Sequence, residues 1–434
     1  MEMIIENIRC FSGIHRVPIK PITVLIGENS TGKTTLLACL EAISDYRSYP
    51  YDIKLNNPSY SLGSFEDIIT KNTSNHDGQF SIGFVTEIIL LDEKSKTESE
   101  DKFEVNATFR EKLGRPYLTQ YSISTSFGSL IVNRRANTSK YSATLTDNFK
   151  NNEKTIIIDT KDLDNEDRND IDFLIYQSLT SRKNHSFDKS DKLVNLFVAL
   201  LMPKRLNSST SIAPIRTEPK RTYHQFKESD QPSGGDIPLI LADYLEKPKR
   251  SKKIKSFTKL LNEFGVDSGL FNKIHIERFK KGKSAPFQVV VDTNGIKSNL
   301  KDVGYGVSQS LPIIVKSIIA NNKIVLIQQP GIHLHPKAQA ALGTFFAKLV
   351  KQNKDCNYVI ESHSDYLFDR LRLEVVKKNL SPSDVVFLYL ERKSKFTKIY
   401  PLEIDENGNI LNAPPSYRDF FLKEDLNLLR RTSK

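Results

Sequence analysis

Cysteine is scarce in this sequence. The 434 residues include only three, Cys10, Cys39 and Cys356, which lie far apart and form no Cys-x-x-Cys pair. This spacing argues against a disulfide framework or a zinc site and is typical of proteins in a reducing compartment. We therefore expect a cytoplasmic protein.

Long apolar runs are also missing. No stretch approaches the ~18 apolar residues that a membrane-spanning helix requires. The segment Met1–Phe11 carries acidic side chains and lacks the basic start of a signal peptide. There is no internal repeat, and no apolar heptad array is long enough for a coiled coil. We therefore expect no membrane segment, no signal peptide and no long coiled coil.

Acidic residues are outnumbered by basic ones. The chain has 63 lysine and arginine residues against 52 aspartate and glutamate residues, which gives a formal net charge of +11. This excess favours an anionic partner, such as nucleic acid or an acidic protein surface. Two basic clusters, the segment Lys247–Lys259 and the group Lys280, Lys281 and Lys283, could contact phosphates. Such lysines are also typical of a solvated helix face, so DNA stays open as a partner.

Strand and helix patterns alternate near both ends of the chain. A short apolar strand over Thr23–Ile26 leads into a glycine-rich loop and then into apolar residues at helical spacing. After about residue 286 the alternation returns, with strands predicted over Lys323–Ile327, Asn357–Ile360 and Val385–Leu390, and helices over Ser308–Ala320, Pro336–Gln352 and Ser364–Lys378. This order predicts an α/β nucleotide-binding core.

The middle of the chain separates the two parts of this core. Residues 46–200 are predicted to be rich in β-strands with exposed polar loops, such as the run 92–102, and residues 188–265 to be mostly helical. We therefore divide the chain into residues 1–45, the N-terminal part of the core; residues 46–285, an insertion; and residues 286–434, the C-terminal part.

The segment between the first apolar strand and helix fits the P-loop pattern G-x-x-x-x-G-K-[ST] without a gap. Glycine permits a backbone in which successive N–H groups surround a phosphate, and the following helix points its positive end at the same phosphate. Lys33 would neutralise the β- and γ-phosphates, and the Thr34 hydroxyl would bind Mg²⁺. The predicted ATP-binding residues are Gly27, Glu28, Asn29, Ser30, Thr31, Gly32, Lys33, Thr34 and Thr35. The sequence thus predicts ATP and Mg²⁺ as cofactors, with Thr34 as the metal ligand.

Several later segments resemble the small AAA-family ATPases that are related to ABC and SMC heads. Leu326–Pro336 resembles the Walker B and D-loop region of that family, Val303–Gln309 its degenerate signature, and Ile360–Ser364 its switch-histidine segment. Ala213–Arg216 and Gly63–Asp67 resemble further landmarks. The segments occur in the order typical of the family. The resemblance implies an ABC-type α/β ATPase head whose P-loop core is split by a large insertion.

The resemblance also implies a head-to-tail homodimer in which ATP lies between the P-loop of one subunit and the signature of the other. Gly304, Gly306 and Ser308 would then contact the nucleotide of the partner. His363 would contact the γ-phosphate.

The histidines leave alternatives open. His333 and His335 would lie on the D-loop near the dimer interface, but on their own they could form a metal site. His363 on its own could be an ordinary residue at the start of a helix. A P-loop fold outside the ABC class is the alternative for the fold.

Acidic residues are missing where the family usually has them. The family usually has at least one glutamate where this chain has Gln328 and Gln329, and often an acid at the position of Gly331. Glutamine can orient water but cannot act as a general base. Gln328 and Gln329, with His363, are the predicted catalytic residues, and hydrolysis is expected to be slow or absent. Glu361 could substitute as the acid, although nothing in the sequence places it at the γ-phosphate.

The sequence shows no second enzymatic domain. About a hundred residues follow the Walker B-like strand, and they contain no acidic cluster of the nuclease type. The chain resembles the ATPase subunits of bacterial antiphage systems, first the Septu ATPase with its HNH nuclease and second the PARIS ATPase with its TOPRIM nuclease. The resemblance implies a sensor and scaffold that regulates a separate effector nuclease, with DNA or a phage component as a further partner. A stand-alone DNA-binding or DNA-repair ATPase is the alternative.

Overall fold

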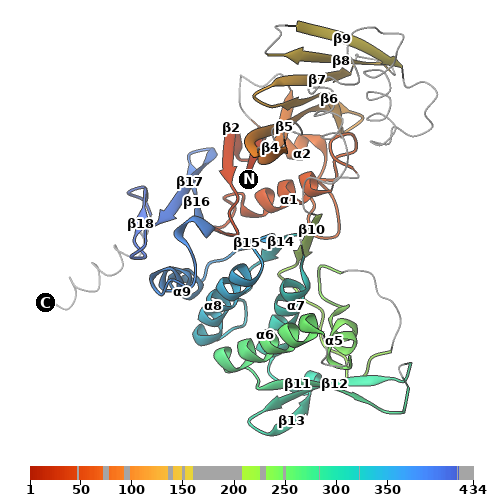
Figure 1. Cartoon of the computed structure of the whole chain (residues 1–434), viewed down its shortest axis with the longest axis vertical. Helices are drawn as coiled ribbons and strands as arrows, with labels where there is room; N and C mark the ends of the chain where they lie inside the picture. The colour runs from red at the N-terminus through yellow and green to blue at the C-terminus, as the bar shows by residue number, and fades with distance from the viewer. Residues whose placement is uncertain are drawn as a thin grey trace, which may run out of the picture.

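Two large β-sheets and one small sheet organise the chain (Figure 1). The computed structural model describes residues 1–45, 48–71, 78–91, 98–134, 140–148, 152–159, 208–224, 231–247, 251–282, 284–321, 323–417 and 419. Among these residues, no helix is long and apolar enough to cross a membrane.

A seven-stranded sheet runs through the middle of the molecule. Its strands, in spatial order, are β10 (Ser208–Ile212), β14 (Lys323–Gln328), β15 (Asn357–Glu361), β3 (Ile22–Gly27), β16 (Val385–Lys393), β17 (Phe396–Ile404) and β18 (Ile410–Leu411). The first five are parallel, and the last two continue the sheet as antiparallel strands. Strands from all parts of the chain therefore meet in one sheet, with the P-loop strand β3 near its centre.

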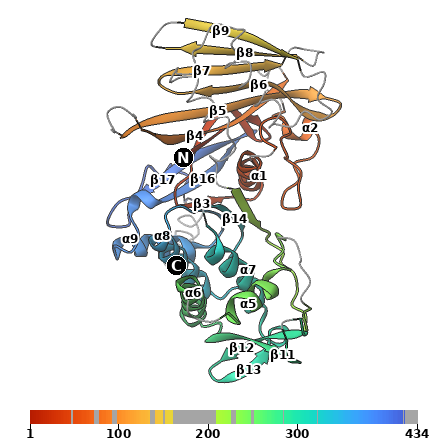
Figure 2. The ribbon, with the colours of Figure 1, turned by 45° about the vertical axis from the view of Figure 1, so that its right-hand side comes forward.

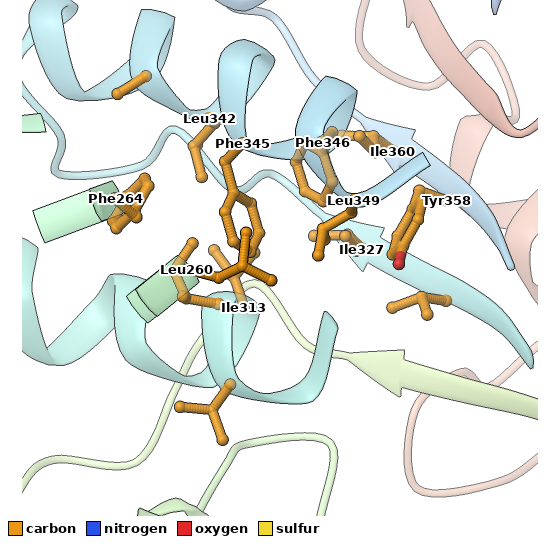
Figure 3. Packing of buried hydrophobic residues seen from close by; sticks show 14 of the residues in the cluster. Leu260, Phe264, Ile313, Ile327, Leu342, Phe345, Phe346, Leu349, Tyr358 and Ile360 are labelled. Carbon is orange, nitrogen blue, oxygen red and sulfur yellow. The ribbon is translucent and has the colours of Figure 1, made fainter. Parts of the chain in front are cut away.

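Both faces of this sheet are buried, because successive side chains of a strand point to opposite faces. Ile324 and Leu326 pack into a core that includes α1 (Lys33–Ser44), whereas Val325 and Ile327 pack into a second core. The second core lies under a helical layer formed by α5 (Ile237–Leu245), α6 (Lys252–Ser268), α7 (Tyr305–Ile319), α8 (Pro336–Gln352) and α9 (Asp365–Val376). Figure 3 shows how aromatic side chains of α8 fill the space between α6, α7 and the strands.

An eight-stranded antiparallel sheet covers the α1 side, and Figure 2 shows its strands stacked in order. The strands, in spatial order, are β2 (Phe11–Pro18), β1 (Glu2–Ile8), β4 (Gln79–Leu91), β5 (Glu98–Lys112), β6 (Arg115–Ser124), β7 (Gly128–Arg134), β8 (Lys140–Asp147) and β9 (Asn152–Asp159). Because β1 pairs with both β2 and β4, this sheet contains strands from both sides of the P-loop.

Smaller elements complete the described chain. The third sheet is formed by β11 (Lys273–Arg278), β12 (Phe287–Thr293) and β13 (Ile296–Asn299) and lies at the opposite end from the eight-stranded sheet. The short helices are α2 (Phe65–Ile68) and the 3₁₀ turns η2 (Leu300–Asp302) and η3 (Pro382–Asp384).

The fold corrects several boundaries of the predicted elements. β5 begins inside the polar run 92–102, because its first residues pair with β4 in a two-stranded extension beyond the ends of β1 and β6, where polar side chains are tolerated. β10 is a strand within a stretch predicted to be mostly helical, because its parallel pairing with β14 outweighs local preference. α7 begins at Tyr305, three residues before the predicted start. The predicted helix over residues 188–207 lies outside the described residues.

Candidate functional site

The site is built at the carboxyl edge of the parallel strands. The end of β3 lies opposite β16, where Gly27 pairs with Leu390. Glu361, at the end of β15, is paired with Leu25 of β3 on one side and with Gln328 of β14 on the other. Since the strands are parallel and in register, the loops after β3, β14 and β15 leave the sheet side by side. This edge is where open α/β sheets bind ligands.

The P-loop backbone requires glycine at two positions. Gly27 has φ 147° and Gly32 has φ 94°, in a region that side chains disfavour. A Cβ at Gly27 would lie 2.4 Å from the carbonyl oxygen of Leu390, and one at Gly32 would lie 2.5 Å from the Cys10 sulfur. No side chain caps the start of α1. The free N–H groups of its first turn are therefore available to an anion.

The Lys33 side chain is buried and turns back into the P-loop. Its Nζ donates hydrogen bonds to the carbonyl oxygens of Gly27 at 2.9 Å and Glu28 at 2.6 Å. Burial lowers the pKa of Lys33, and the nearby Glu361 and Glu28 oppose this shift. The ammonium group thus lies at the centre of the loop, where a phosphate would meet it.

Hydrogen bonds from other side chains hold the P-loop in its conformation. Thr31 donates to the carbonyl oxygen of Glu28 at 2.9 Å, and Arg392 donates to that of Ser30 at 3.4 Å. Asn29 is exposed, and Thr35 is buried in α1. The loop is therefore braced by its own side chains and by the end of β16.

Thr34 and Glu361 meet at this edge. The Thr34 hydroxyl donates to Glu361 Oε2 at 3.2 Å, with Oε1 at 3.5 Å. Glu361 is only 5% exposed. Burial raises the pKa of its carboxyl group, and Lys33 and the hydrogen bond from Thr34 oppose the shift. The structure thus supplies the placement of Glu361 that the sequence could not.

The two glutamines lie one strand away from this carboxylate. Gln328 is 7% exposed, and its Nε2 has no hydrogen-bond partner among the described residues. Gln329 has φ 43°, and its backbone N–H donates to the carbonyl oxygen of Glu361 at 2.8 Å. The side chain of Gln328 is therefore buried at the end of β14, whereas the backbone of Gln329 joins the ends of β14 and β15.

Arg216 is a site residue that sequence reasoning treated only as part of a landmark. Its Nη2 donates to the carbonyl oxygens of Gln328 at 3.0 Å and Gln329 at 3.5 Å. Burial lowers the pKa of Arg216 to about 10, and the nearby Tyr305 opposes the shift. Nε and Nη1 have no partner in the part of the chain that the structure describes. In the sequence Arg216 stood only within the landmark Ala213–Arg216, and nothing there indicated a contact with the two glutamines.

His363 lies two residues after the end of β15, and its side chain is exposed. Partial burial lowers the pKa of its imidazole, and the charge of Lys33 lowers it further. Both effects favour the neutral form of the imidazole. Its contact with a γ-phosphate stays a prediction.

The predicted signature residues lie at the start of α7. Gly304 precedes the helix, and no atom lies within 4 Å of the position that its Cβ would take. Ser308 is buried, and its hydroxyl donates to the carbonyl oxygen of Tyr305 at 3.0 Å. Gly304 and the 46% exposed Tyr305 therefore form the accessible surface of this segment, and the Ser308 side chain faces inward.

The signature segment packs against the loop after β14. The rings of Tyr305 and His333 meet edge to face with centroids 4.9 Å apart, and a Cβ at Gly306 would lie 3.3 Å from the His333 carbonyl oxygen. His335 Nδ1 accepts from the Lys337 backbone N–H at 3.3 Å, at the start of α8. No cluster of three or more metal-ligating side chains occurs among the described residues, so nothing here supports the alternative of a metal site at these histidines.

Replacing Glu361 should stabilise the nucleotide-free protein at neutral pH. A carboxyl group whose folded-state pKa lies above its ordinary value of 4.5 contributes fully to stability below that pH, and the contribution is lost as pH rises through the raised value. Glu361→Gln should therefore raise the free energy of unfolding by about 1 kcal/mol at pH 7–8, with a smaller difference near pH 4.5. Urea unfolding at both pH values measures this. Glu28→Gln, at an exposed position of the same loop, is the control; an equal gain there would contradict the argument.

One family of known proteins matches the part of the chain that contains these segments. The profile of the AAA ATPase domain family matches residues 1–368, a stretch that contains the P-loop, the signature segment and His363. A search of curated proteins gives no match.

Solved structures similar to the chain include two SMC heads. The SMC head domain from Thermotoga maritima has 9% identity and a TM-score of 0.39, with 93% of this chain and 98% of that chain covered. The Smc head domain with an extended coiled coil, bound to the C-terminal domain of ScpA, from Pyrococcus furiosus has 8% identity and a TM-score of 0.38, with 100% and 99% covered.

A third similar structure comes from work on the ATP-driven dimerization and DNA-stimulated activation of SMC ATPases. It has 8% identity and a TM-score of 0.26, with 46% of this chain and 98% of that chain covered. The sheet order and the family match confirm the predicted α/β ATPase head with a split P-loop core, and the described residues contain no long coiled coil.

Proposed function

We propose, since this chain belongs to the AAA ATPase domain family, that it binds ATP with Mg²⁺ at Gly27–Thr34. The observation that carries the proposal is the conformation of the P-loop, which places a buried lysine between free helix N–H groups and two glycines with positive φ. Lys33 would turn from the loop carbonyls to the phosphates, and the first turn of α1 would hold the same phosphates with its N–H groups.

The residues around the P-loop also fit a metal ion. The Thr34 hydroxyl and a buried carboxylate lie together, and both are oxygen ligands of the kind that Mg²⁺ prefers. Bound Mg²⁺ would neutralise phosphate charge. Gln328 and Gln329 would orient water without accepting its proton, and His363 would approach the γ-phosphate. Turnover is therefore expected to be slow, and the bound nucleotide would act mainly as a conformational switch.

We further propose that two copies close on ATP head to tail. Gly304 is exposed and has open space around it, as a residue that receives the nucleotide of a partner requires. The neighbouring Tyr305 is also partly exposed, so the start of α7 presents an accessible surface to a second subunit. For this chain, the exposure of that segment is the observation that supports the proposed dimer.

ATP with Mg²⁺ should convert the monomer to a dimer, and Gly304→Arg should prevent this. The new side chain enters open space in the monomer, so the fold should tolerate it, whereas it would block a partner subunit. We expect at least about a tenfold weaker dimer, or ~1.4 kcal/mol. Light scattering after size exclusion measures the mass, with Gly304→Ala as the matched control. A Gly304→Arg protein that dimerises like the wild type would refute the head-to-tail arrangement.

The biological role that we propose is an ATP-gated sensor and scaffold of a cytoplasmic antiphage system. The effector would be a separate nuclease, an HNH nuclease as in Septu or a TOPRIM nuclease as in PARIS, and DNA or a phage component would be a further partner. The resemblance of the motifs supports this role. Co-purification with the product of a neighbouring gene tests it; a chain that purifies only as a monomer with every candidate partner would count against it.

The alternative role, a stand-alone DNA-binding ATPase, rests on the basic segment Lys247–Lys259. In the described part of this segment Lys252, Lys253 and Lys255 are exposed on α6. Lys247 pairs with Asp243 at 2.7 Å and Lys259 with Glu263 at 3.7 Å, so part of the charge is neutralised locally. This favours a solvated helix face, and we retain the regulatory role as the conclusion.

A further inference from the structure

We propose that Glu361, at the end of β15, is the acidic residue that holds the Mg²⁺ of the bound nucleotide, in place of the acid missing from the end of β14. The inference rests on the proposed binding of ATP at the P-loop. It assigns the metal-binding carboxylate to a different strand from the one that the Walker B-like segment indicates.

The sheet register explains how the acid can change strands. Gln328 and Glu361 are paired residues of neighbouring parallel strands, and both are the last residues of those strands. Paired residues of adjacent strands point to the same face, about 4.8 Å apart. Because β15 lies between β14 and β3, the carboxylate of Glu361 is one strand closer to the P-loop than any side chain at position 328.

The contact with Thr34 identifies what this carboxylate faces. Glu361 Oε2 lies 3.2 Å from the Thr34 hydroxyl, which is the P-loop group that ligates Mg²⁺ in such sites. In ATPases Mg²⁺ is usually held by one or two carboxylates together with substrate phosphates and waters. A single carboxylate beside Thr34 matches this pattern.

Gln328 is a poor alternative ligand. Its amide carries no charge, and its buried Nε2 lacks a hydrogen-bond partner among the described residues. The backbone is nevertheless well placed there, because Gln329 N–H and the Glu361 carbonyl oxygen tie the two strand ends together at 2.8 Å. A carboxylate returned to position 328 should therefore reach the same metal.

Glu361 could instead act only as a charge partner of Lys33. The geometry speaks against this, because Lys33 Nζ donates to the carbonyl oxygens of Gly27 and Glu28, and no ion pair with Glu361 occurs among the described residues. Lys33 affects the pKa of Glu361 through its charge, without a hydrogen bond. Glu361 is thus an almost wholly buried carboxylate whose one hydrogen-bond donor among the described residues is a neutral hydroxyl, which leaves it able to bind a metal ion.

The test compares nucleotide affinity with and without the metal. Calorimetry with ATPγS gives the Kd in Mg²⁺ and in EDTA for the wild type, Glu361→Gln and Glu374→Gln. Glu374→Gln is the matched control, because Glu374 of α9 is another buried carboxylate that accepts a hydrogen bond from a threonine hydroxyl, that of Thr344 at 2.8 Å. Mn²⁺ bound in the presence of ATPγS, measured by electron paramagnetic resonance, provides a readout of the metal itself.

We expect Mg²⁺ to tighten wild-type binding by at least about tenfold, and Glu361→Gln to reduce this ratio to less than about threefold with loss of bound Mn²⁺. Glu374→Gln should keep the wild-type ratio. Gln328→Glu in the Glu361→Gln background should restore the ratio and the Mn²⁺ signal, which a merely structural role of Glu361 would not allow. Should Glu361→Gln fail to fold, Glu361→Ala carries the same comparison.

Three outcomes overturn the inference: a wild-type ratio in Glu361→Gln, an equal loss in Glu374→Gln, or no restoration by Gln328→Glu in a folded protein. A wild type that binds no nucleotide under either condition would instead refute the proposed function. The two failures are therefore distinguishable.

Discussion

Lys33→Ala should weaken ATP binding by at least about 100-fold. The lysine is the one cation that lies inside the loop formed by the described residues 27–34, with its ammonium group 2.9 Å from the Gly27 carbonyl oxygen. A hydrogen bond to a charged group contributes about 1.5–3 kcal/mol, and the two phosphates that Lys33 would contact bring the loss to ~3 kcal/mol or more. Calorimetry with ATPγS measures the loss.

Two further variants make this result specific. Lys33→Met keeps the aliphatic stem and should lose the affinity to a similar extent. Lys259→Ala removes an exposed lysine of α6 and should leave the affinity unchanged. Because Lys33 also braces Gly27 and Glu28, thermal unfolding of each variant must accompany the titration. Retained affinity in a folded Lys33→Ala protein would refute the P-loop assignment.

Phe346→Ala should produce the largest loss of stability among the substitutions considered. Phe346 has no exposed surface and packs between α8 and the seven-stranded sheet, with ring centroids 5.5 Å from both Phe345 and Tyr358 (Figure 3). Truncation leaves a cavity in a core that is close-packed, and such changes cost about 3–5 kcal/mol. Urea unfolding followed by circular dichroism measures the change in the free energy of unfolding.

The control for this variant is another phenylalanine. Phe279 is 57% exposed, so Phe279→Ala should change the free energy of unfolding by less than about 0.5 kcal/mol. Equal losses in the two variants would show that the packing of α8 on β14 and β15 contributes little. Because Tyr358 belongs to β15, the cavity left by Phe346→Ala should also destabilise this strand, which ends at Glu361.

The parts of the fold with strong local signals were predictable from the sequence. The P-loop has a pattern in which glycine, lysine and threonine each have a separate physical task, and the buried strand before it fixes its position. The strands β14, β15 and β16 each contain a continuous apolar run, as strands buried on both faces do. Their starts could be predicted to the residue, and the ends of β14 and β15 to within one residue.

Pairings between distant segments could not be predicted in this way. β10 is polar over most of its length and forms a strand because β14 offers it an edge. Glu361 was visible as an acid after a strand, but its distance from Thr34 depends on which strand lies between β14 and β3. Ser308 was assigned to the partner's nucleotide from the motif alone, whereas its place in the first turns of α7 decides that the side chain faces inward.

The pairing of β1 with both β2 and β4 has a consequence for the evolution of such chains. Replacing only the segment between α1 and β10 would not replace the whole eight-stranded sheet. Two of its strands, β1 and β2, precede the P-loop in the sequence. A recombination event that replaced only the middle segment would have to preserve the edge that β1 offers to β4, or else leave an unpaired strand exposed to aggregation. The N-terminal hairpin and the middle segment are therefore expected to be inherited together.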